Sequence, residues 1–336
     1  MVNYYLKRTA KAIVTIYIVI TLSFGLTRML PGNPASRIRG RLSSIGYTEE
    51  QIQVVLSNLG YNPNVPLQEK FVEYIAGLHQ GSMGSSIQVS GGGVPVTEII
   101  ASHLPWTILI TVVSIVLFFA ISITLGAVMA YREGSRFDSA NSALAIFASG
   151  IPFFVMAILL VFFFGQILGW FPTGRRYSLD VDPGFNLAFL HSVLYHATLP
   201  IAAIVLSRYG VRALAMRGNS ISILGKGYVE VAKLRGLPER VIALRYVGRN
   251  AVLPMYTGML LSFGWVLGGT IVLEDVFQYQ GLGYLLFQAY DYRDYPVLMG
   301  AFLVITLSLV VGIFLADLSY GFVDPRIKTG DESESF

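Results

Sequence analysis

The chain has 336 residues, of which 54% are hydrophobic and 13% are charged, about half the charged fraction of a typical soluble domain. It contains 24 Lys and Arg residues against 20 Asp and Glu residues, and no Cys. This composition excludes a disordered chain, a disulfide scaffold and an ordinary cytosolic enzyme, and the lack of Cys excludes thiolate metal sites. Because the basic residues mainly flank long apolar stretches, we predict a membrane protein without a nucleic-acid partner.

Six stretches are long and apolar enough to cross a bilayer as helices, which takes about 20 residues each. The predicted spans are Ala12–Leu30, Trp106–Tyr131, a span within Ser139–Trp170, Leu194–Met216, Ala251–Leu273 and Tyr295–Tyr320. The first has no small-residue cleavage site at its end, so we interpret it as a retained span and not a secretory signal. Pro152 and Pro200 are candidate kinks in the third and fourth spans, although we favour ordinary helix packing there.

The orientation follows from the basic residues beside the spans. A cytoplasmic N-terminus places 16 basic residues inside and 8 outside. The predicted fold class is therefore an all-α membrane protein with six transmembrane helices, cytoplasmic termini, an extracytoplasmic segment after the first helix, and a short cytoplasmic helix between the fourth and fifth. The predicted division is residues 1–30 (N-terminus and first span), 31–105 (extracytoplasmic segment), 106–322 (transmembrane core, with the cytoplasmic loop 217–250) and 323–336 (cytoplasmic tail).

The extracytoplasmic segment is long enough to hold structure. Apolar residues at helical spacing predict amphipathic helices over Thr48–Leu59 and Pro66–Leu78, and a Gly/Ser-rich loop, Gly81–Gly93, follows them. Two interpretations stay open. The segment is either a cap or interfacial hairpin on the outer mouth, where it would gate entry, or a solvated loop with two surface helices.

The cytoplasmic loop 217–250 is dense in basic residues and longer than a simple connection requires. Gly227 and Gly236 bracket a short helix, Tyr228–Arg235. Gly236 suits the position after a helix that needs a positive φ, and Pro238 suits the first turn of the next helix. The pattern predicts a stiff helix that projects from the membrane between two breaks, although the charge alone is equally typical of membrane-surface anchoring.

The sequence contains none of the nucleotide-binding, catalytic or metal-binding motifs that we sought. No G-x-x-x-x-G-K-[ST] occurs, because Gly225-Lys226 is followed by Gly227, which lacks the hydroxyl that holds Mg²⁺. We therefore expect no ATP binding, no enzymatic activity and no cofactor in this chain. The four His residues are scattered and are not predicted to bind metal: His79, His103, His191 and His196.

The predicted spans have almost no ionisable residue at mid-depth, where ion-coupled carriers usually keep one. Those near the span ends are expected to reach a membrane face: Arg28, Arg208, Arg212, Glu274 and Asp317. Two further clusters are interpreted as structural. Small residues at positions 258, 262, 264 and 268 suit close helix packing. The tyrosines around the last outer loop read as an aromatic belt: Tyr279, Tyr284, Tyr290, Tyr292 and Tyr295.

Four motifs together carry a resemblance to a known family. Tyr228-Val229-Glu230-Val231-Ala232-Lys233-Leu234-Arg235-Gly236 closely resembles the EAA loop of ABC importer permeases, with Val231 in place of the first Ala. The other three resemble the dipeptide/oligopeptide branch of that family. They are Arg249-Asn250-Ala251-Val252-Leu253-Pro254, Leu30-Pro31-Gly32-Asn33-Pro34, and Gly81–Ser86 through Val94-Pro95-Val96 and Leu104-Pro105. The resemblance extends to the C-terminal Asp324-Pro325-Arg326.

The resemblance implies a permease subunit in the cell membrane, surrounded by lipid. It would pair with a second homologous permease and two cytoplasmic ABC ATPases, which bind the ATP and Mg²⁺, and receive substrate from an extracytoplasmic solute-binding protein. The short helix would be a coupling helix that docks into an ATPase groove during alternating access. The residues carried over are Tyr228, Val229, Glu230, Ala232, Gly236 and Leu237.

The substrate stays open at this stage. Di- or oligopeptides are the first expectation, and oligosaccharides or a nickel chelate are the alternatives within the same family. A stand-alone ion-coupled transporter is the alternative from another class, and no pore residue is assigned.

Overall fold

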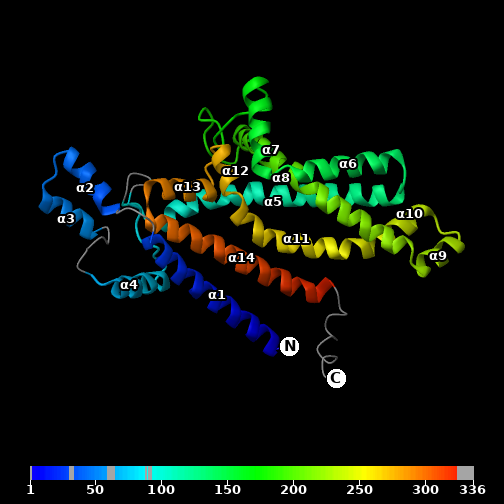
Figure 1. The fold of residues 1–336 in the computed structure, drawn as a ribbon, viewed down its shortest axis with the longest axis horizontal. Helices are drawn as coiled ribbons and strands as arrows, with labels where there is room; N and C mark the ends of the chain where they lie inside the picture. The colour runs from blue at the N-terminus through cyan, green and yellow to red at the C-terminus, as the bar shows by residue number, and fades with distance from the viewer. Residues whose placement is uncertain (1, 30–33, 59–64, 88, 90–92, 324–336) are drawn as a thin grey trace. The chain divides into compact units, whose positions relative to one another are not determined.

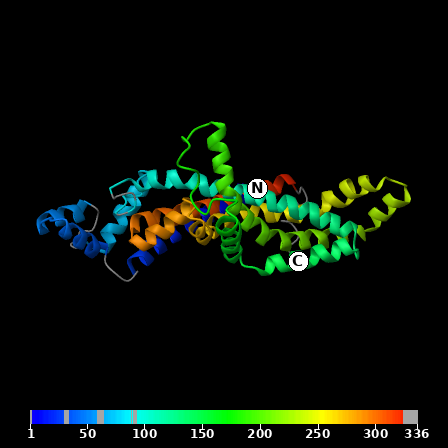
Figure 2. The ribbon, with the colours of Figure 1, turned by 90° about the horizontal axis from the view of Figure 1, so that it is seen from above.

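The computed structural model describes residues 2–29, 34–58, 65–87, 89 and 93–323 (Figures 1 and 2). In these ranges the secondary structure is helical, apart from one isolated antiparallel bridge between Ser85 and Pro95, which confirms the all-α class. The chain divides into two compact units. Unit 1 comprises residues 1–106 and 280–310, and unit 2 comprises residues 107–279 and 311–336.

Unit 1 contains the helices of the predicted extracytoplasmic segment. Its elements are α1 (Val2–Met29), α2 (Pro34–Ser44), α3 (Glu49–Asn58), α4 (Leu67–His79), the start of α5 (Val96–Tyr131), α13 (Leu282–Tyr292) and the start of α14 (Tyr295–Val323). Helices α3 and α4 confirm the two predicted amphipathic helices. Helix α2 was not predicted, because its Arg-rich sequence has no clear apolar stripe. Residues 30–33 of the Leu30–Pro34 motif lie outside the described residues.

Helix α3 begins with a reciprocal cap that its sequence specifies. The backbone N–H of Thr48 donates to Gln51 Oε1 over 3.0 Å, and the N–H of Gln51 donates to Thr48 Oγ1 over 3.4 Å. This capping box satisfies two N–H groups that a helix start otherwise leaves without partners. Ile52 and Leu56 then point from α3 into a small core that also contains Ile38 and Ile87.

Helix α4 packs on α1 through aromatic side chains. The Phe24 ring lies 5.0 Å from the Phe71 ring in an edge-on arrangement and 6.0 Å from the Tyr74 ring, between ring centroids. Burial in this contact raises the pKa of Tyr74 to about 12, and the nearby Arg28 charge opposes part of that rise. A hydrogen bond of 2.9 Å joins Tyr17 Oη and His79 Nε2. These contacts fix the predicted extracytoplasmic helix α4 to the first predicted span.

Unit 2 holds most of the predicted transmembrane core. It contains α5 from residue 107 onward, followed by α6 (Arg136–Gly150), α7 (Phe153–Leu160), η2 (Val161–Ile167), α8 (Leu187–Leu224), α9 (Gly227–Leu234), α10 (Glu239–Val241), η3 (Ile242–Gly248), α11 (Arg249–Gly269) and α12 (Ile271–Val276). The segments η2 and η3 are π-helical.

The third predicted span is broken. Residues Arg136–Gly150 and Phe153–Ile167 meet at an angle of 95°, at the position of Pro152. Proline has no backbone N–H and restricts the residue before it, so the helix ends there. The expectation of ordinary packing at Pro152 is therefore wrong. Pro200, in contrast, lies inside the continuous helix α8.

Helices α6 and α8 pack closely and are joined by an ion pair. A Cβ added at Gly210 of α8 would collide with the backbone of Ala145, so only glycine permits this approach. Near the start of α6, Asp138 accepts hydrogen bonds from Arg217 Nε over 2.6 Å and from Arg217 Nη2 over 2.7 Å. Bidentate geometry of this kind is among the stronger polar contacts in proteins.

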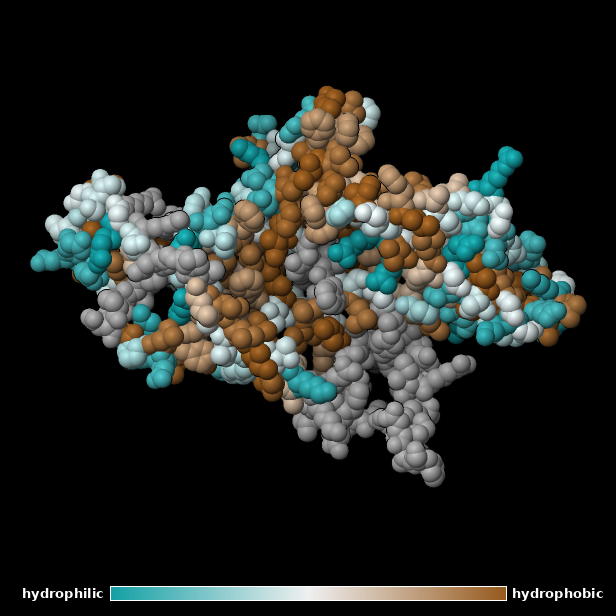
Figure 3. Space-filling view, in the orientation of Figure 1, coloured by the Kyte–Doolittle hydropathy of each residue, from teal (hydrophilic) through white to brown (hydrophobic). Residues whose placement is uncertain are grey.

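Within the described residues, four helices are long and apolar enough to cross a membrane: residues Thr9–Met29 of α1, Val96–Tyr131, Leu187–Leu224 and Tyr295–Phe314 of α14. The bent pair α6 and α7–η2 makes a fifth if it counts as one span. Figure 3 shows apolar side chains over the region that Figure 1 labels α7. In η2, which follows α7, Phe162 and Phe163 are exposed. The predicted span Ala251–Leu273 coincides with α11 and α12.

The side chains at positions 263–269, including Gly264 and Gly268, and at Asp317 lie outside the described residues, as does Asp324-Pro325-Arg326. The chain is thus a multi-pass protein, while the count of six spans and the orientation stay predictions.

Two sequence interpretations need correction. Glu274 does not extend to the protein surface as expected: its side chain is fully buried in unit 2, and Thr107 Oγ1 donates to its Oε1 over 2.8 Å. The tyrosines near the last predicted outer loop are not one belt. Tyr279 and Tyr295 are core residues, and burial raises the pKa of Tyr279, whereas Tyr290 and Tyr292 are exposed. Spacing along the sequence does not distinguish a belt from a core.

Candidate functional site

The predicted coupling helix is α9, Gly227–Leu234, one residue earlier at each end than the sequence indicated. Helix α8 stops at Leu224, and Gly225 and Lys226 form the break before α9 begins. Figures 1 and 2 both draw α9 and α10 at the extremity of unit 2, beyond the end of α8. The helix therefore projects from the end of α8 between two breaks, as predicted.

The C-terminal end of α9 is closed by a left-handed residue. Gly236 has φ +70°, a region that non-glycine residues seldom adopt, which confirms the sequence prediction. Its N–H donates to Lys233 O over 2.9 Å, and the N–H of Leu237 donates to Ala232 O over 3.3 Å. This pair of bonds is the Schellman arrangement. Pro238 then precedes α10 as its cap residue and is not inside the first turn.

One face of α9 is buried on the chain's own core. Val229 and Ala232 are 0% and 2% exposed and pack with Ile242 and Val247 of η3. Partly buried side chains surround this cluster: Ile223, Leu224, Leu237 and Tyr246. Two of the predicted site residues, Val229 and Ala232, therefore hold α9 in place, and Leu237 supports them from the end of the helix.

The opposite face of α9 is open and apolar. Val231 is 54% exposed and Leu234 is 83% exposed, with Tyr228 on the flank at 44%. The charged residues Glu230 and Lys233 are exposed beside them. Val231, which replaces an Ala of the family motif, thus enlarges the apolar surface. The sequence did not predict which face points outward, because the buried partner η3 follows 8 residues later and is π-helical.

The base of α9 is joined to the ends of other helices in unit 2. The Tyr131 hydroxyl, at the end of α5, hydrogen-bonds the Glu239 carboxylate of α10. Asn219 of α8 donates from Nδ2 to the backbone oxygen of Ala251 in α11 over 3.5 Å. Together with the Asp138–Arg217 pair, these contacts connect the segment around α9 to α5, α6, α8 and α11.

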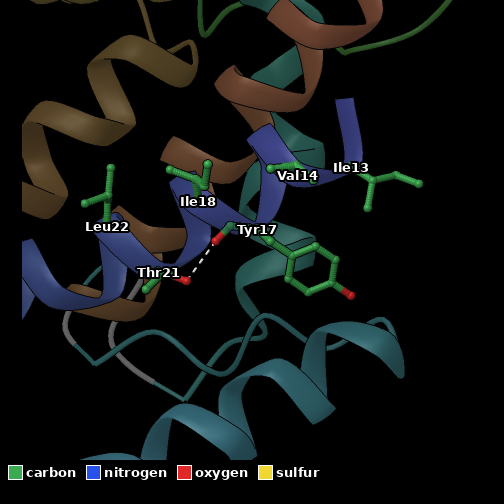
Figure 4. Close-up of a pocket in the computed structure, with 6 residues that line it drawn as sticks. All are labelled: Ile13, Val14, Tyr17, Ile18, Thr21 and Leu22. Atoms are coloured by element: carbon green, nitrogen blue, oxygen red, sulfur yellow. Dashed lines mark hydrogen bonds between the residues drawn. The ribbon is translucent and has the colours of Figure 1, made fainter. Parts of the chain in front are cut away.

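A separate hollow lies along α1 and is lined by six residues of that helix: Ile13, Val14, Tyr17, Ile18, Thr21 and Leu22 (Figure 4). Its polar Thr21 hydroxyl donates to Tyr17 O over 2.8 Å within the same helix. A groove formed by one apolar helix face, without a convergent polar group, suits lipid chains better than a polar solute. Among the described residues, no group of three or more His, Asp or Glu residues is arranged to hold a metal ion.

Comparisons with known proteins give one consistent result. Residues 122–329 match the family described as the binding-protein-dependent transport system inner membrane component, and residues 1–111 match the N-terminal region of the membrane component of such systems. The oligopeptide transport system permease protein AppB of Bacillus subtilis is 31% identical over 98% of this chain and 100% of its own.

The glutathione transport system permease protein GsiC of Pectobacterium atrosepticum is 32% identical over 98% of this chain and 99% of its own. Among solved structures, an inward-facing MetNI methionine ABC transporter matches 68% of this chain and 97% of its own, with a TM-score of 0.53 and 16% identity. At that identity the structural likeness concerns the fold alone.

Proposed function

Since the chain belongs to the family of binding-protein-dependent transport system inner membrane components, we propose that it is a permease subunit of an ATP-driven importer of peptides. It is a multi-pass membrane protein of a transport family, not of a catalytic one. The names of the relatives, which refer to oligopeptides, glutathione and peptides, favour a peptide substrate. Oligosaccharides and nickel chelates are then outcomes of the substrate test below.

The observation that carries the proposal is the division of α9 into two faces. Val229 and Ala232 anchor the helix in its own core, while Val231 and Leu234 present apolar surface outward. A short helix with an exposed apolar face fits a groove on a partner, and such a contact transmits force only if the helix cannot bend at its base. In the proposal the groove belongs to a cytoplasmic ABC ATPase.

The proposed cycle assigns each part a physical task. Two ATPases bind ATP and Mg²⁺, close on each other, and carry along the coupling helices docked on them. Because α9 is packed on η3 and joined to the end of α8, its displacement moves the helices of unit 2. A second permease of similar fold completes the pathway, which opens alternately to each side, and a solute-binding protein supplies the peptide. Glu230 and Tyr228 flank the docking face.

The test compares two exposed leucines. Leu234→Asp places a charge in the proposed interface, where burying a leucine would contribute about 2 kcal/mol. The expected result is at least about tenfold weaker co-purification of the ATPase and a matching loss of peptide uptake. Leu179→Asp alters a residue that is 75% exposed in the loop before α8, and should leave both unchanged.

Normal uptake in Leu234→Asp would refute the docking role of α9. Uptake by the purified chain alone in liposomes, without ATPases, would refute the importer and support an ion-coupled carrier. A panel of peptides, oligosaccharides and nickel chelates in the same uptake assay identifies the substrate class.

A further inference from the structure

Asp294 lies at the joint between α13 and α14. Helix α13 ends at Tyr292, and its cap residue Arg293 adopts a left-handed conformation with φ 57°. The N–H of Asp294 donates back to Ala289 O over 2.8 Å. Helix α14 begins one residue later. Asp294 Oδ1 accepts from the N–H of Val297 over 3.4 Å, and its backbone oxygen accepts from Leu298 over 2.9 Å. One residue therefore ends one helix and caps the next.

The second carboxylate oxygen of Asp294 binds a segment about 200 residues earlier in the chain. Oδ2 accepts hydrogen bonds from Ser86 Oγ over 2.6 Å, from the N–H of Ile87 over 2.8 Å and from the N–H of Val89 over 3.1 Å. Ser86 and Asp294 are both 0% exposed. Hydrogen bonds to a charged acceptor are stronger than neutral ones, and their loss in a buried site is costly.

The bound segment, residues 83–87 and 89, lies beside residues 93–96, and these described residues together are here called the Ser86 hairpin. Its two sides are joined by hydrogen bonds from Ser86 N to Val94 O over 2.8 Å and from Val96 N to Gly84 O over 3.0 Å. The hairpin also packs on α14. A Cβ added at Gly300 would lie 2.6 Å from Val96 Cγ1, so the absence of a side chain permits the contact. This hairpin contains the motif of residues 81–86 and 94–96, which the proposed coupling to the ATPase does not involve.

We propose that Asp294 is a positioning residue that fastens the Ser86 hairpin to the start of α14, so that the two move as one body during transport. The inference rests on the proposed permease function for its role, although not for its geometry. Two independent contacts support a single body: the carboxylate holds the hairpin at one point, and the Gly300 packing holds it further along α14. If this contact broke while the groups stayed buried, a carboxylate and its donors would lose their partners, which is costly.

The first experiment measures the attachment without reference to transport. The chain has no Cys, so a cysteine introduced by Val89→Cys, at a side chain that is 5% exposed, is the only thiol of this chain that a membrane-impermeant maleimide can label, and labelling is measured on the chain after its purification from treated membranes. In Asp294→Asn, an amide replaces the carboxylate, and whichever way it turns, its NH₂ group faces an N–H or O–H donor. We expect labelling at position 89 to become at least about tenfold faster.

Two controls make this result specific. Ser85→Cys introduces a target at an exposed position of the same hairpin and should be labelled at equal rates with and without Asp294→Asn. Asp291→Asn removes an exposed carboxylate three residues earlier and should leave labelling at position 89 slow. Unchanged labelling at position 89 in Asp294→Asn, or equal acceleration in Asp291→Asn, would overturn the attachment.

The second experiment measures uptake per amount of membrane-inserted chain. We expect Asp294→Asn to lower the maximal rate about tenfold and to leave the half-saturating solute concentration unchanged, because the hairpin affects movement and not solute affinity. Ser86→Ala, which removes one of three donors, should give a smaller loss and keeps the test valid if Asp294→Asn is poorly inserted. Faster labelling with normal uptake would show that Asp294 attaches the hairpin but that transport does not depend on this attachment, and would refute the proposed joint movement. Failure of the unsubstituted complex to take up any solute would refute the proposed function and leave the attachment standing.

Discussion

Gly236→Ala tests whether the proposed coupling role of α9 depends on the left-handed residue that ends this helix. The glycine has φ +70° and open space around the position of a Cβ, so the substitution introduces no collision and changes only the backbone preference. A left-handed conformation costs a non-glycine residue about 1–2 kcal/mol, and the reduced freedom of the unfolded chain offsets about half of that. The net cost is about 1 kcal/mol, a roughly fivefold change in an equilibrium.

The substitution therefore destabilises two hydrogen bonds that depend on this conformation, from Gly236 N–H to Lys233 O and from Leu237 N–H to Ala232 O. Hydrogen exchange at the amides of residues 236 and 237 should therefore become about fivefold faster, and uptake should fall while membrane insertion stays normal. Gly227→Ala is the matched control, because Gly227 also has open space but lies in the first turn of α9 without a positive φ. Equal exchange rates in the two variants would refute the reasoning.

The remaining predictions concern contacts that stabilise each unit. Asp138→Asn should lower the free energy of unfolding by about 2 kcal/mol, because it breaks the bidentate contact of a carboxylate that is 3% exposed, and thermal unfolding in detergent measures this loss. Equal unfolding temperatures would contradict it. For Tyr74, the unfolded phenol ionises near pH 10 and the folded one at about 12, so its contribution to stability is complete below about pH 10 and is lost as the pH rises toward 12. Tyr74→Phe should reduce the loss of stability over this range, and an unchanged profile would show that Tyr74 is not its source.

Local rules predicted the parts of the fold that neighbouring residues determine. Gly236 was placed correctly because a helix end of this kind depends on one residue and its immediate neighbours. The break at Pro152 is also local, yet it was only the less favoured alternative, since proline is compatible with a continuous helix at Pro200. The left-handed Arg293 was not predicted, because arginine seldom adopts a positive φ. The attachment of Ser86 to Asp294 depends on residues about 200 positions apart, which no periodicity in the sequence reports.

The same limit explains why the sequence predicted a coupling helix but did not predict which of its residues are buried in the chain's own core and which are exposed for docking. Val229, Val231 and Ala232 are all apolar and lie next to one another in the sequence. Their difference arises only because η3 covers Val229 and Ala232 and leaves Val231 open. The proposed role needs both kinds of contact. Without an exposed face the helix could not bind a partner, and without a buried face it would move relative to unit 2 and transmit no force. The two tasks therefore belong to adjacent residues, and substitutions on the two faces should impair transport by separate routes: loss of docking on the outer face, and loss of transmitted force on the inner one.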